Sequence, residues 1–196
     1  MQKGHVMNEQ KTLEFYYGTV NSAKSMTLLA KHHAWNTTGK NVCIVKPATD
    51  TRANGVASRI GISEEADIIL SSESTLKHHV DLLKDKDLIL VDEVQFLTSE
   101  QIMELRMLSV GLLDERIKPV TVQCFGLRTL SNGELWDSVK TLMAQADVIS
   151  EIPTVCAFCS EKAAFSKALN DTEKAGVKIS WGSFIPVCAY HFFHKP

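Results

Sequence analysis

The segment 18-GTVNSAKS-25 has the residue types and spacing of a phosphate-binding loop, with one exception. Such loops read G-x-x-x-x-G-K-[ST], and Ala23 stands where the second glycine is expected. Backbone N–H groups of these loops hold phosphates, the lysine (Lys24) reaches the β- and γ-phosphates, and the hydroxyl (Ser25) binds Mg²⁺. An alanine forced into a left-handed backbone costs about 1 kcal/mol, which the rest of the loop can sustain. Taken alone, the segment is equally compatible with a strand–turn–helix corner that carries an incidental Lys-Ser pair.

A pair of carboxylates, Asp92 and Glu93, ends the apolar run 87-DLILV-91. Proteins with a phosphate-binding loop place an acidic residue at the end of such a strand to hold Mg²⁺, directly or through water, and Asp92 fits this role. Glu93 then lies close enough to act as a general base. A surface pair of acids at a strand end is the alternative, and the phosphate-loop pattern earlier in the chain weighs against it.

Four residues near the C-terminus have metal-ligand spacing, in 156-CAFC-159 and 188-CAYH-191. Three thiolates and one imidazole suit a closed tetrahedral zinc site. We therefore predict structural Zn²⁺ bound by Cys156, Cys159, Cys188 and His191, with no open coordination position for catalysis. His194 is an alternative to His191, at a less usual spacing.

The elements that must position these groups alternate along the chain. Runs that are apolar on both faces predict buried parallel strands at 13–18, 41–45, 66–70, 87–91 and 120–126. Helical spacing predicts helices at 25–35, 75–83, 100–110 and 134–146. This alternation predicts an α/β fold: a P-loop NTPase-like, mostly parallel sheet flanked by helices.

The pattern changes after 147-DVISEI-152 to short, cysteine-bearing, turn-rich sequence. We expect a flexible N-terminal tail (1–12), a nucleotide-binding α/β domain (13–152) and a small zinc-binding lobe (153–196). Cys43 and Cys124 lie within apolar strands and are expected to be buried thiols.

Composition excludes several classes of protein. Lys+Arg 21 against Asp+Glu 23 gives a net charge of −2, and no run of Lys/Arg occurs, so we expect no nucleic-acid partner. No apolar stretch approaches the length of a membrane span, and the polar first ten residues lack a signal peptide's apolar segment. Five cysteines, three of them in metal-ligand spacing, favour a reducing, cytoplasmic location.

The P-loop, 92-DEVQF-96 and the Cys/His pairs, in this order, resemble the thymidine kinases of the zinc-containing type, which occur in bacteria, animals, phages and large DNA viruses. The segments 46-KPATDTR-52, 58-SRIG-61 and 124-CFGLRT-129 extend the resemblance, which runs from about Leu13 to His191. It implies ATP- and Mg²⁺-dependent transfer of the γ-phosphate to the 5′-hydroxyl of thymidine, or of deoxyuridine, in nucleotide salvage.

The same resemblance implies roles for individual residues. Glu93 corresponds to the general base that takes the proton of the 5′-hydroxyl. Beyond the P-loop, contacts to ATP and Mg²⁺ are implied for Asp50, Thr51, Arg52, Asp92, Glu93, Val94 and Gln95. Val20, Phe96, Leu127, Ser131, Trp136, Ser166, Ile179, Ser180 and Phe184 are implied to surround the nucleoside. Without the resemblance, most of the apolar members of this set are better explained as core residues.

The chain departs from the family pattern in places. Ser131 stands where a phenylalanine is usual, Phe184 where a tyrosine is usual, and the covering loop 177–184 lacks the common Gly-Gly. Family members commonly form homotetramers and are inhibited by dTTP, and the resemblance implies both here. Two alternatives remain open: a catalytically weak nucleotide-binding or sensing protein of the same fold, and a zinc-knuckle, nucleic-acid-dependent ATPase.

Overall fold

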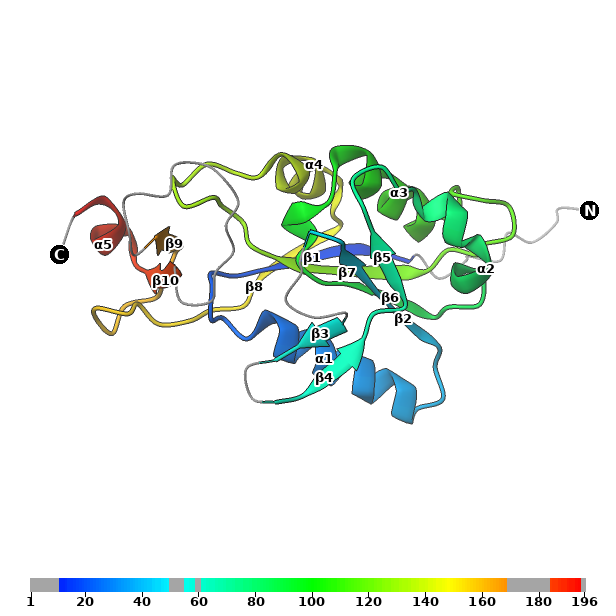
Figure 1. Cartoon of the computed structure of the whole chain (residues 1–196), viewed down its shortest axis with the longest axis horizontal. Helices are drawn as coiled ribbons and strands as arrows, with labels where there is room; N and C mark the ends of the chain where they lie inside the picture. Colours follow the sequence, from blue (N-terminus) through cyan, green and yellow to red (C-terminus); the bar gives the residue numbers. More distant parts are fainter. Residues whose placement is uncertain (1–10, 50–54, 59–60, 169–183, 195–196) are drawn as a thin grey trace, which may run out of the picture.

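The computed structural model describes residues 11–49, 55–58, 61–168 and 184–194. A 6-stranded sheet with strand order β5-β2-β6-β7-β1-β8 forms its centre (Figure 1). Every neighbouring pair of strands is parallel, as the sequence predicts. The strands are β1 (Leu13–Tyr17), β2 (Val42–Pro47), β5 (Ile68–Leu70), β6 (Leu88–Val91), β7 (Thr121–Gly126) and β8 (Val148–Glu151).

Helices cover both faces of the sheet (Figure 1). One face carries α2 (Val80–Leu83), α3 (Ser99–Ser109) and α4 (Asp137–Gln145). The other face carries α1 (Lys24–Thr37) and an antiparallel hairpin of β3 (Gly55–Ala57) and β4 (Ser63–Glu65). Two short 3-10 helices, η1 (Leu76–His79) and η2 (Val94–Phe96), precede α2 and follow β6.

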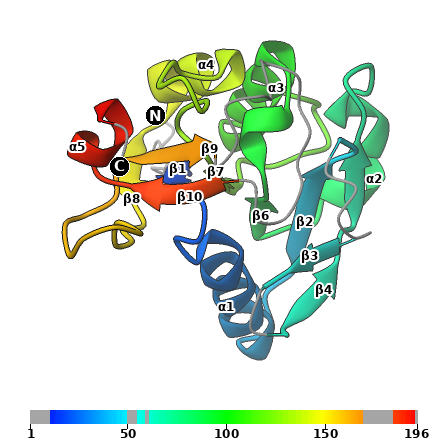
Figure 2. The same ribbon diagram turned by 60° about the vertical axis from the view of Figure 1, so that its left-hand side comes forward.

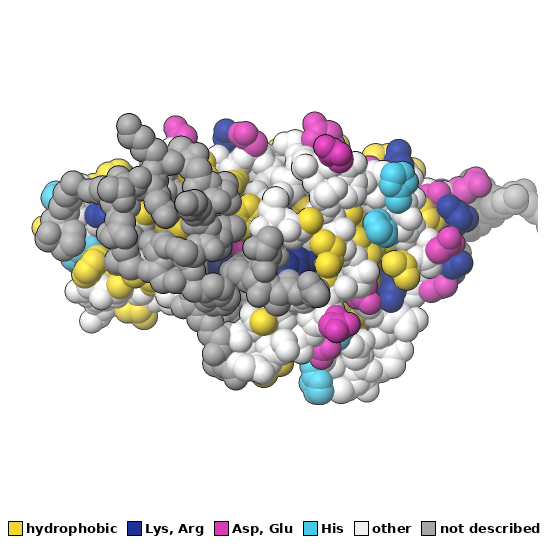
Figure 3. Space-filling model, in the orientation of Figure 1, with side chains coloured by type: hydrophobic (Ala, Val, Ile, Leu, Met, Phe, Trp, Pro, Cys, Tyr) yellow, Lys and Arg dark blue, Asp and Glu magenta, His cyan; other side chains and the backbone are white. Residues whose placement is uncertain are grey.

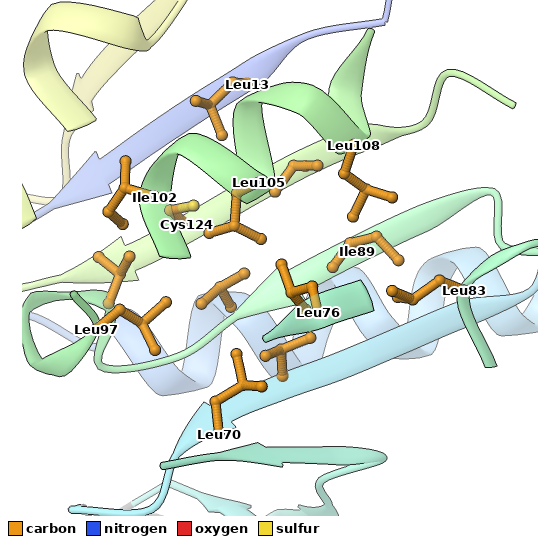
Figure 4. Close-up of a cluster of buried hydrophobic side chains, with 14 of the residues drawn as sticks. Leu13, Leu70, Leu76, Leu83, Ile89, Leu97, Ile102, Leu105, Leu108 and Cys124 are labelled. Atoms are coloured by element: carbon orange, nitrogen blue, oxygen red, sulfur yellow. The ribbon is translucent and has the colours of Figure 1, made fainter. Parts of the chain in front are cut away.

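Successive residues of the central strands alternate between two buried cores. In β2, Cys43 and Val45 join the core beneath α2, α3 and α4, whereas Val42 and Ile44 join the core beneath α1. Figure 4 shows the first of these cores, with leucines of the covering helices packed on side chains of the sheet. Burial on both faces explains why these strands read as continuous apolar runs.

The start of α3 is fixed by a capping box. The Thr98 hydroxyl accepts the N–H of Gln101 at 3.2 Å, and the Gln101 side-chain oxygen accepts the N–H of Thr98 at 3.0 Å. The side-chain amide of Gln101 also donates to the carbonyls of Ser71 and Ser74, at 2.8 and 2.9 Å. Gln101 is thus a buried glutamine with a purely structural set of partners, which ties α3 to the segment after β5.

Three expected elements differ from the structure. The segment 75–83 is the 3-10 helix η1 followed by a short α2, because Glu104 of α3 holds the hydroxyl of Thr75 and the N–H of Leu76. The helix expected from residue 134 begins only at Asp137, since residues 129–135 form a turn closed by a Thr129–Leu135 bridge. The strand expected at 66–70 begins at Ile68, because the carboxylate of Asp67 accepts the N–H of Ile44.

The other expected strands and helices form with boundaries within about two residues. The hairpin β3–β4, strand β8 and the C-terminal elements were not expected. Strand β4 is entirely exposed and reads Ser-Glu-Glu, so its sequence contains no apolar alternation to reveal it. Cys43 and Cys124 are buried, as predicted, and burial raises the pKa of Cys43 to about 12.

The C-terminal segment forms a small lobe beside the carboxyl ends of β1 and β7 (Figure 2). It contains the antiparallel pair β9 (Phe165–Ala168) and β10 (Phe184–Val187) and the short helix α5 (Ala189–Phe193). Its own core consists of Cys156, Val187 and Cys188, with partly buried neighbours such as Phe165 and Phe192. In the described part of the chain, no helix is both long enough and apolar enough to cross a membrane.

Candidate active site and metal centre

The loop after β1 and the carboxylates after β6 lie together around the end of β7. The N–H of Gly18 donates to the carbonyl of Gly126 at 3.3 Å, which joins the loop to β7. The Ser25 hydroxyl donates to Oδ2 of Asp92 at 3.3 Å, which joins the first turn of α1 to the end of β6. Residues 67 positions apart thus form one polar site at the carboxyl edge of the sheet.

The P-loop is curled around the ammonium group of Lys24, a side chain that is only 9% exposed. Lys24 Nζ donates to the carbonyl of Thr19 at 2.7 Å and lies 3.4 Å from Ser22 Oγ and 3.5 Å from the Gly18 carbonyl. Lys24 is the first residue of α1, so its positive charge lies near the N-terminus of this helix. The N–H groups of a helix N-terminus also favour a bound anion. The loop can therefore present positive charge and backbone N–H groups to a phosphate.

Backbone strain is concentrated at this site. Among the described residues, the non-glycine positive φ angles are 64° at Asn21, 61° at Ala23 and 48° at Glu93. Ala23 thus adopts the left-handed conformation that the motif's glycine would adopt more easily. Residues held in such conformations often cluster at functional sites, where the surrounding structure enforces them.

Replacing Ala23 by glycine should therefore leave stability unchanged or increase it. The left-handed conformation costs alanine about 1–2 kcal/mol, and the greater freedom of glycine in the unfolded chain offsets about 0.4–1 kcal/mol of that gain. We expect the free energy of unfolding of Ala23→Gly, measured by urea denaturation, to rise by about 0–1.6 kcal/mol. Ala30→Gly, at an exposed position within α1, is the matched control and should lose about 1 kcal/mol. Equal losses in both variants would contradict the left-handed backbone at Ala23.

Gly18 is required for steric reasons at the start of the loop. A Cβ atom there would lie 2.2 Å from Ser22 Oγ and 2.6 Å from the carbonyl oxygen of Ile152. We expect Gly18→Ala to lower the free energy of unfolding by about 1–3 kcal/mol, as overpacking does, and to weaken ATP binding measured by calorimetry. Gly39→Ala, where the added Cβ meets no atom within 4 Å but φ is +76°, should affect stability alone. If Gly18→Ala bound ATP as tightly as the parent protein, the loop would accommodate the added methyl group without losing its phosphate-binding shape.

Both carboxylates of the DE pair are buried at the end of β6. Asp92 is 4% exposed, and its N–H donates to the carbonyl of Val45 at 3.0 Å. Glu93 is 9% exposed, and its Oε2 accepts a hydrogen bond of 2.5 Å from Nε2 of Gln95. A hydroxyl beside a buried carboxylate, as in Ser25 and Asp92, is a donor set that suits Mg²⁺ together with phosphate oxygens.

The other predicted contact residues fall into distinct environments. Val94 is fully buried in the core beneath the helices, and Gln95 is 2% exposed. The rings of Phe96 and Trp136 meet edge to face, with centroids 5.3 Å apart. Ser131 is exposed, and Phe184 begins β10. Asp50, Thr51, Arg52, Ile179 and Ser180 lie outside the described residues.

Leu127 and Ser166, both predicted nucleoside contacts, line one small pocket beside the P-loop residues Gly18 and Thr19. The Ser166 hydroxyl accepts the N–H of Val20 at 3.0 Å, so β9 is hydrogen-bonded directly to the P-loop. Five further lining residues were not predicted from the sequence: Tyr17, Arg128, Thr129, Glu151 and Ala164. Arg128 and Thr129 lie within 124-CFGLRT-129, a segment that carries the family resemblance, whereas Tyr17, Glu151 and Ala164 belong to no motif.

The four predicted zinc ligands come together, with their ligand atoms all within 4.8 Å of one another. Tetrahedral zinc, with its usual bond lengths, requires about 3.8 Å between sulfurs and about 3.6 Å between sulfur and nitrogen. The Sγ atoms of Cys159 and Cys188 are 3.8 Å apart, and His191 Nδ1 lies 3.5, 3.6 and 3.2 Å from Cys156, Cys159 and Cys188. The cluster therefore fits a zinc ion.

His191, rather than His194, completes this cluster. His194 Nδ1 lies 3.1 Å from the carbonyl of Tyr190 instead. Burial opposes ionisation of Cys156, but hydrogen bonds from the N–H groups of Cys188, Phe158 and Cys159 and from the Cys159 thiol together outweigh burial and lower the pKa of Cys156 to about 6. A thiol that ionises readily is a better metal ligand, because the thiolate is the form that binds.

Figure 3 shows basic and acidic side chains interspersed on the described surface, without a patch of one charge. On the described part of this face, the basic side chains form no stripe of the kind typical of nucleic-acid binding.

Comparison with known proteins identifies the family. The family model described as Thymidine kinase matches residues 11–192. Similar proteins include the thymidine kinases of Mannheimia succiniciproducens (39% identical, covering 93% of this chain and 95% of the relative), Haemophilus influenzae (37%; 93% and 96%) and Lactococcus lactis (36%; 94% and 97%). Likeness to the solved structure of DnaA from Aquifex aeolicus is slight, with 16% identity over 70% of this chain and 39% of that chain and a TM-score of 0.36. Since the family match and these relatives cover nearly its whole length, this chain belongs to the thymidine kinase family.

Proposed function

We propose that the protein transfers the γ-phosphate of ATP to the 5′-hydroxyl of thymidine, giving dTMP and ADP, with deoxyuridine as a second acceptor. The observation that carries the proposal is the contact between Ser25 and Asp92, which brings the P-loop and the DE pair into one site. Family membership supports thymidine as the acceptor.

In this reaction the residues divide the work between binding phosphate and moving a proton. Lys24 and the loop N–H groups neutralise the phosphates, while Ser25 and Asp92 hold Mg²⁺. The bound ion supplies positive charge to the phosphate oxygens. Glu93 accepts the proton of the 5′-hydroxyl as its oxygen bonds to the γ-phosphorus. The bond from phosphorus to the bridging oxygen breaks, and ADP leaves with the electron pair.

The proposal has further parts. The sequence pattern supports a nucleotide-binding domain (13–152) beside a structural zinc lobe (153–196) and a cytoplasmic location. The family resemblance supports ATP contacts from residues 50–52, a cover over the base from residues 179–184, a homotetrameric assembly, inhibition by dTTP and a role in nucleotide salvage. The Ser166 hydroxyl, already bonded to Val20, would contribute to the pocket from the zinc lobe.

The proposal is tested by incubating the protein with γ-labelled ATP, Mg²⁺ and thymidine, deoxyuridine, deoxycytidine or no nucleoside. We expect labelled monophosphate with thymidine and none with deoxycytidine. No transfer to any nucleoside, from protein that still binds ATP and zinc, would favour the nucleotide-binding or sensing alternative. ATP hydrolysis stimulated by nucleic acid without nucleoside would favour the ATPase alternative.

A further inference from the structure

Gln95 has an unusual position, because its side chain bridges the candidate general base and the end of β7. It lies two residues after Glu93 and is 2% exposed. Its Nε2 donates to Glu93 Oε2 at 2.5 Å, while its Oε1 accepts the N–H of Leu127 at 2.9 Å. The amide therefore fills the space between two segments 32 positions apart in the chain.

The chemistry of these partners fixes which way the amide faces. A backbone N–H can only donate, so the atom of Gln95 that meets Leu127 must be the carbonyl oxygen. The NH₂ group then necessarily faces Glu93, to which it can only donate. Gln95 thus gives Glu93 a hydrogen bond that suits a carboxylate, the form that a general base needs before it accepts a proton.

Neighbouring residues hold Gln95 itself in place. The hydroxyl of Ser138, which is 3% exposed, donates to the Gln95 carbonyl at 2.8 Å. Gly126 provides room for the amide and for Val94, since a Cβ there would lie 2.5 Å from Gln95 Oε1 and 2.8 Å from Val94 Cγ1. The glycine of 124-CFG-126 is therefore explained by close approach of these two side chains, and β7 becomes the support for the amide.

We propose that Gln95 is a positioning residue that fixes the carboxylate of Glu93 against the end of β7, and that it acts on the reaction through Glu93 rather than by binding the nucleotide. The proposal rests on the proposed function, in which Glu93 is the general base. It predicts that removing the side-chain amide of Gln95 lowers kcat, because a general base outside its productive position accepts the proton less effectively. ATP binding should stay intact.

The test compares two variants of Gln95. Gln95→Leu removes the whole bridge. Gln95→Glu has nearly the same shape and keeps an acceptor for the N–H of Leu127, but it replaces the donor to Glu93 by a second carboxyl group, and two buried carboxyls in contact cannot readily both be ionised. We expect kcat for thymidine phosphorylation to fall about 10–100-fold in both, the range seen when residues that orient a site are removed. The KM for ATP and the calorimetric Kd for ATP should change less than threefold, by our order-of-magnitude expectation for a side chain that does not touch the nucleotide.

Gln101→Leu is the matched control, because Gln101 is an equally buried glutamine whose partners are Thr98, Ser71 and Ser74 of the scaffold. It should lower the midpoint of thermal unfolding and leave kcat unchanged. A fall in kcat for Gln101→Leu as large as that for Gln95→Leu would mean that the effect at Gln95 is one of general stability, and would overturn the proposal.

A double variant separates this inference from the proposed function. If Gln95 acts through Glu93, Gln95→Leu should have no further effect on kcat in a Glu93→Gln background, since the group it positions is gone. Additive losses, or a loss of ATP affinity in Gln95→Leu, would instead make Gln95 a nucleotide contact and overturn the inference. Absence of thymidine phosphorylation by the unaltered protein would overturn the proposed function itself.

Discussion

Replacing Glu93 by glutamine is expected to lower kcat for thymidine phosphorylation by about 10²–10⁴-fold, the contribution typical of a general base. Glutamine has almost the same size and cannot accept a proton at neutral pH. Glu93 lies directly after Asp92, so it is adjacent to the groups proposed to hold Mg²⁺ and phosphate. Lys24, Ser25 and Asp92 are unchanged in this variant, and we therefore expect its Kd for ATP, measured by calorimetry, to stay close to that of the parent.

Glu104→Gln is a control for the loss of a carboxylate elsewhere. Glu104 accepts the N–H of Leu76 at 2.8 Å and bonds to the hydroxyl of Thr75, so it has a structural role between α3 and η1. This variant should lose stability and keep kcat. If Glu93→Gln retained kcat within about threefold of the parent, far less than the loss expected for a base, another group would have to take the proton.

The central strands that are buried on both faces and the zinc ligands could be predicted from the sequence because their causes are local. A strand buried on both faces must be apolar at every position, and 42-VCIV-45 shows this alternation between two cores. Zinc ligands occur in pairs whose spacing reflects the tight turns around the metal. The P-loop was recognisable despite Ala23, because the other fixed positions are kept and Ala23 accepts a left-handed φ of 61°.

The remaining features depend on contacts between distant segments. Nothing near Gln95 indicates that its amide meets Leu127, or that Gly126 is a glycine partly because of that amide. Similarly, Ser166 shows no sign in its own segment of bonding to Val20, 146 positions away. The late start of α4 follows from the turn in which Gly133 has a φ of +89°. Helical periodicity is judged over a window of many residues, so it does not detect so short a turn.

Loss of zinc is expected to have the largest effect on stability. Among the described residues, the lobe's own hydrophobic cluster has Cys156, Val187 and Cys188 as its buried members, and two of these are ligands. So small a core cannot hold a lobe together alone, and structural zinc binding contributes about 10–16 kcal/mol in small zinc peptides. We expect Cys159→Ser, or a strong chelator, to unfold the lobe while the sheet keeps its secondary structure. Proteolysis and the near-ultraviolet circular dichroism of the lobe's aromatic residues would report this.

Unfolding of the lobe should also weaken ATP binding, although no zinc ligand lies in the P-loop. Ser166 of β9 accepts the N–H of Val20, and Arg128, at the end of β7, donates to the carbonyl of Ala164 at 3.3 Å. Loss of these contacts frees the loop that must hold phosphate. We therefore expect the Kd for ATP to rise about tenfold in Cys159→Ser, a coupling of roughly 1.4 kcal/mol, within the usual range for linked sites.

Two controls make the zinc prediction specific. Cys43→Ala removes a buried thiol from β2, outside the metal cluster, and should keep one zinc per chain while it loses some stability. His194→Ala should also retain zinc, whereas His191→Ala should lose it, because only the His191 ring faces the three sulfurs among the described residues. Zinc content measured by atomic absorption distinguishes these variants. Retention of zinc and of parental stability by both Cys159→Ser and His191→Ala would show that the cluster is not a metal site, and the lobe would then require another source of stability.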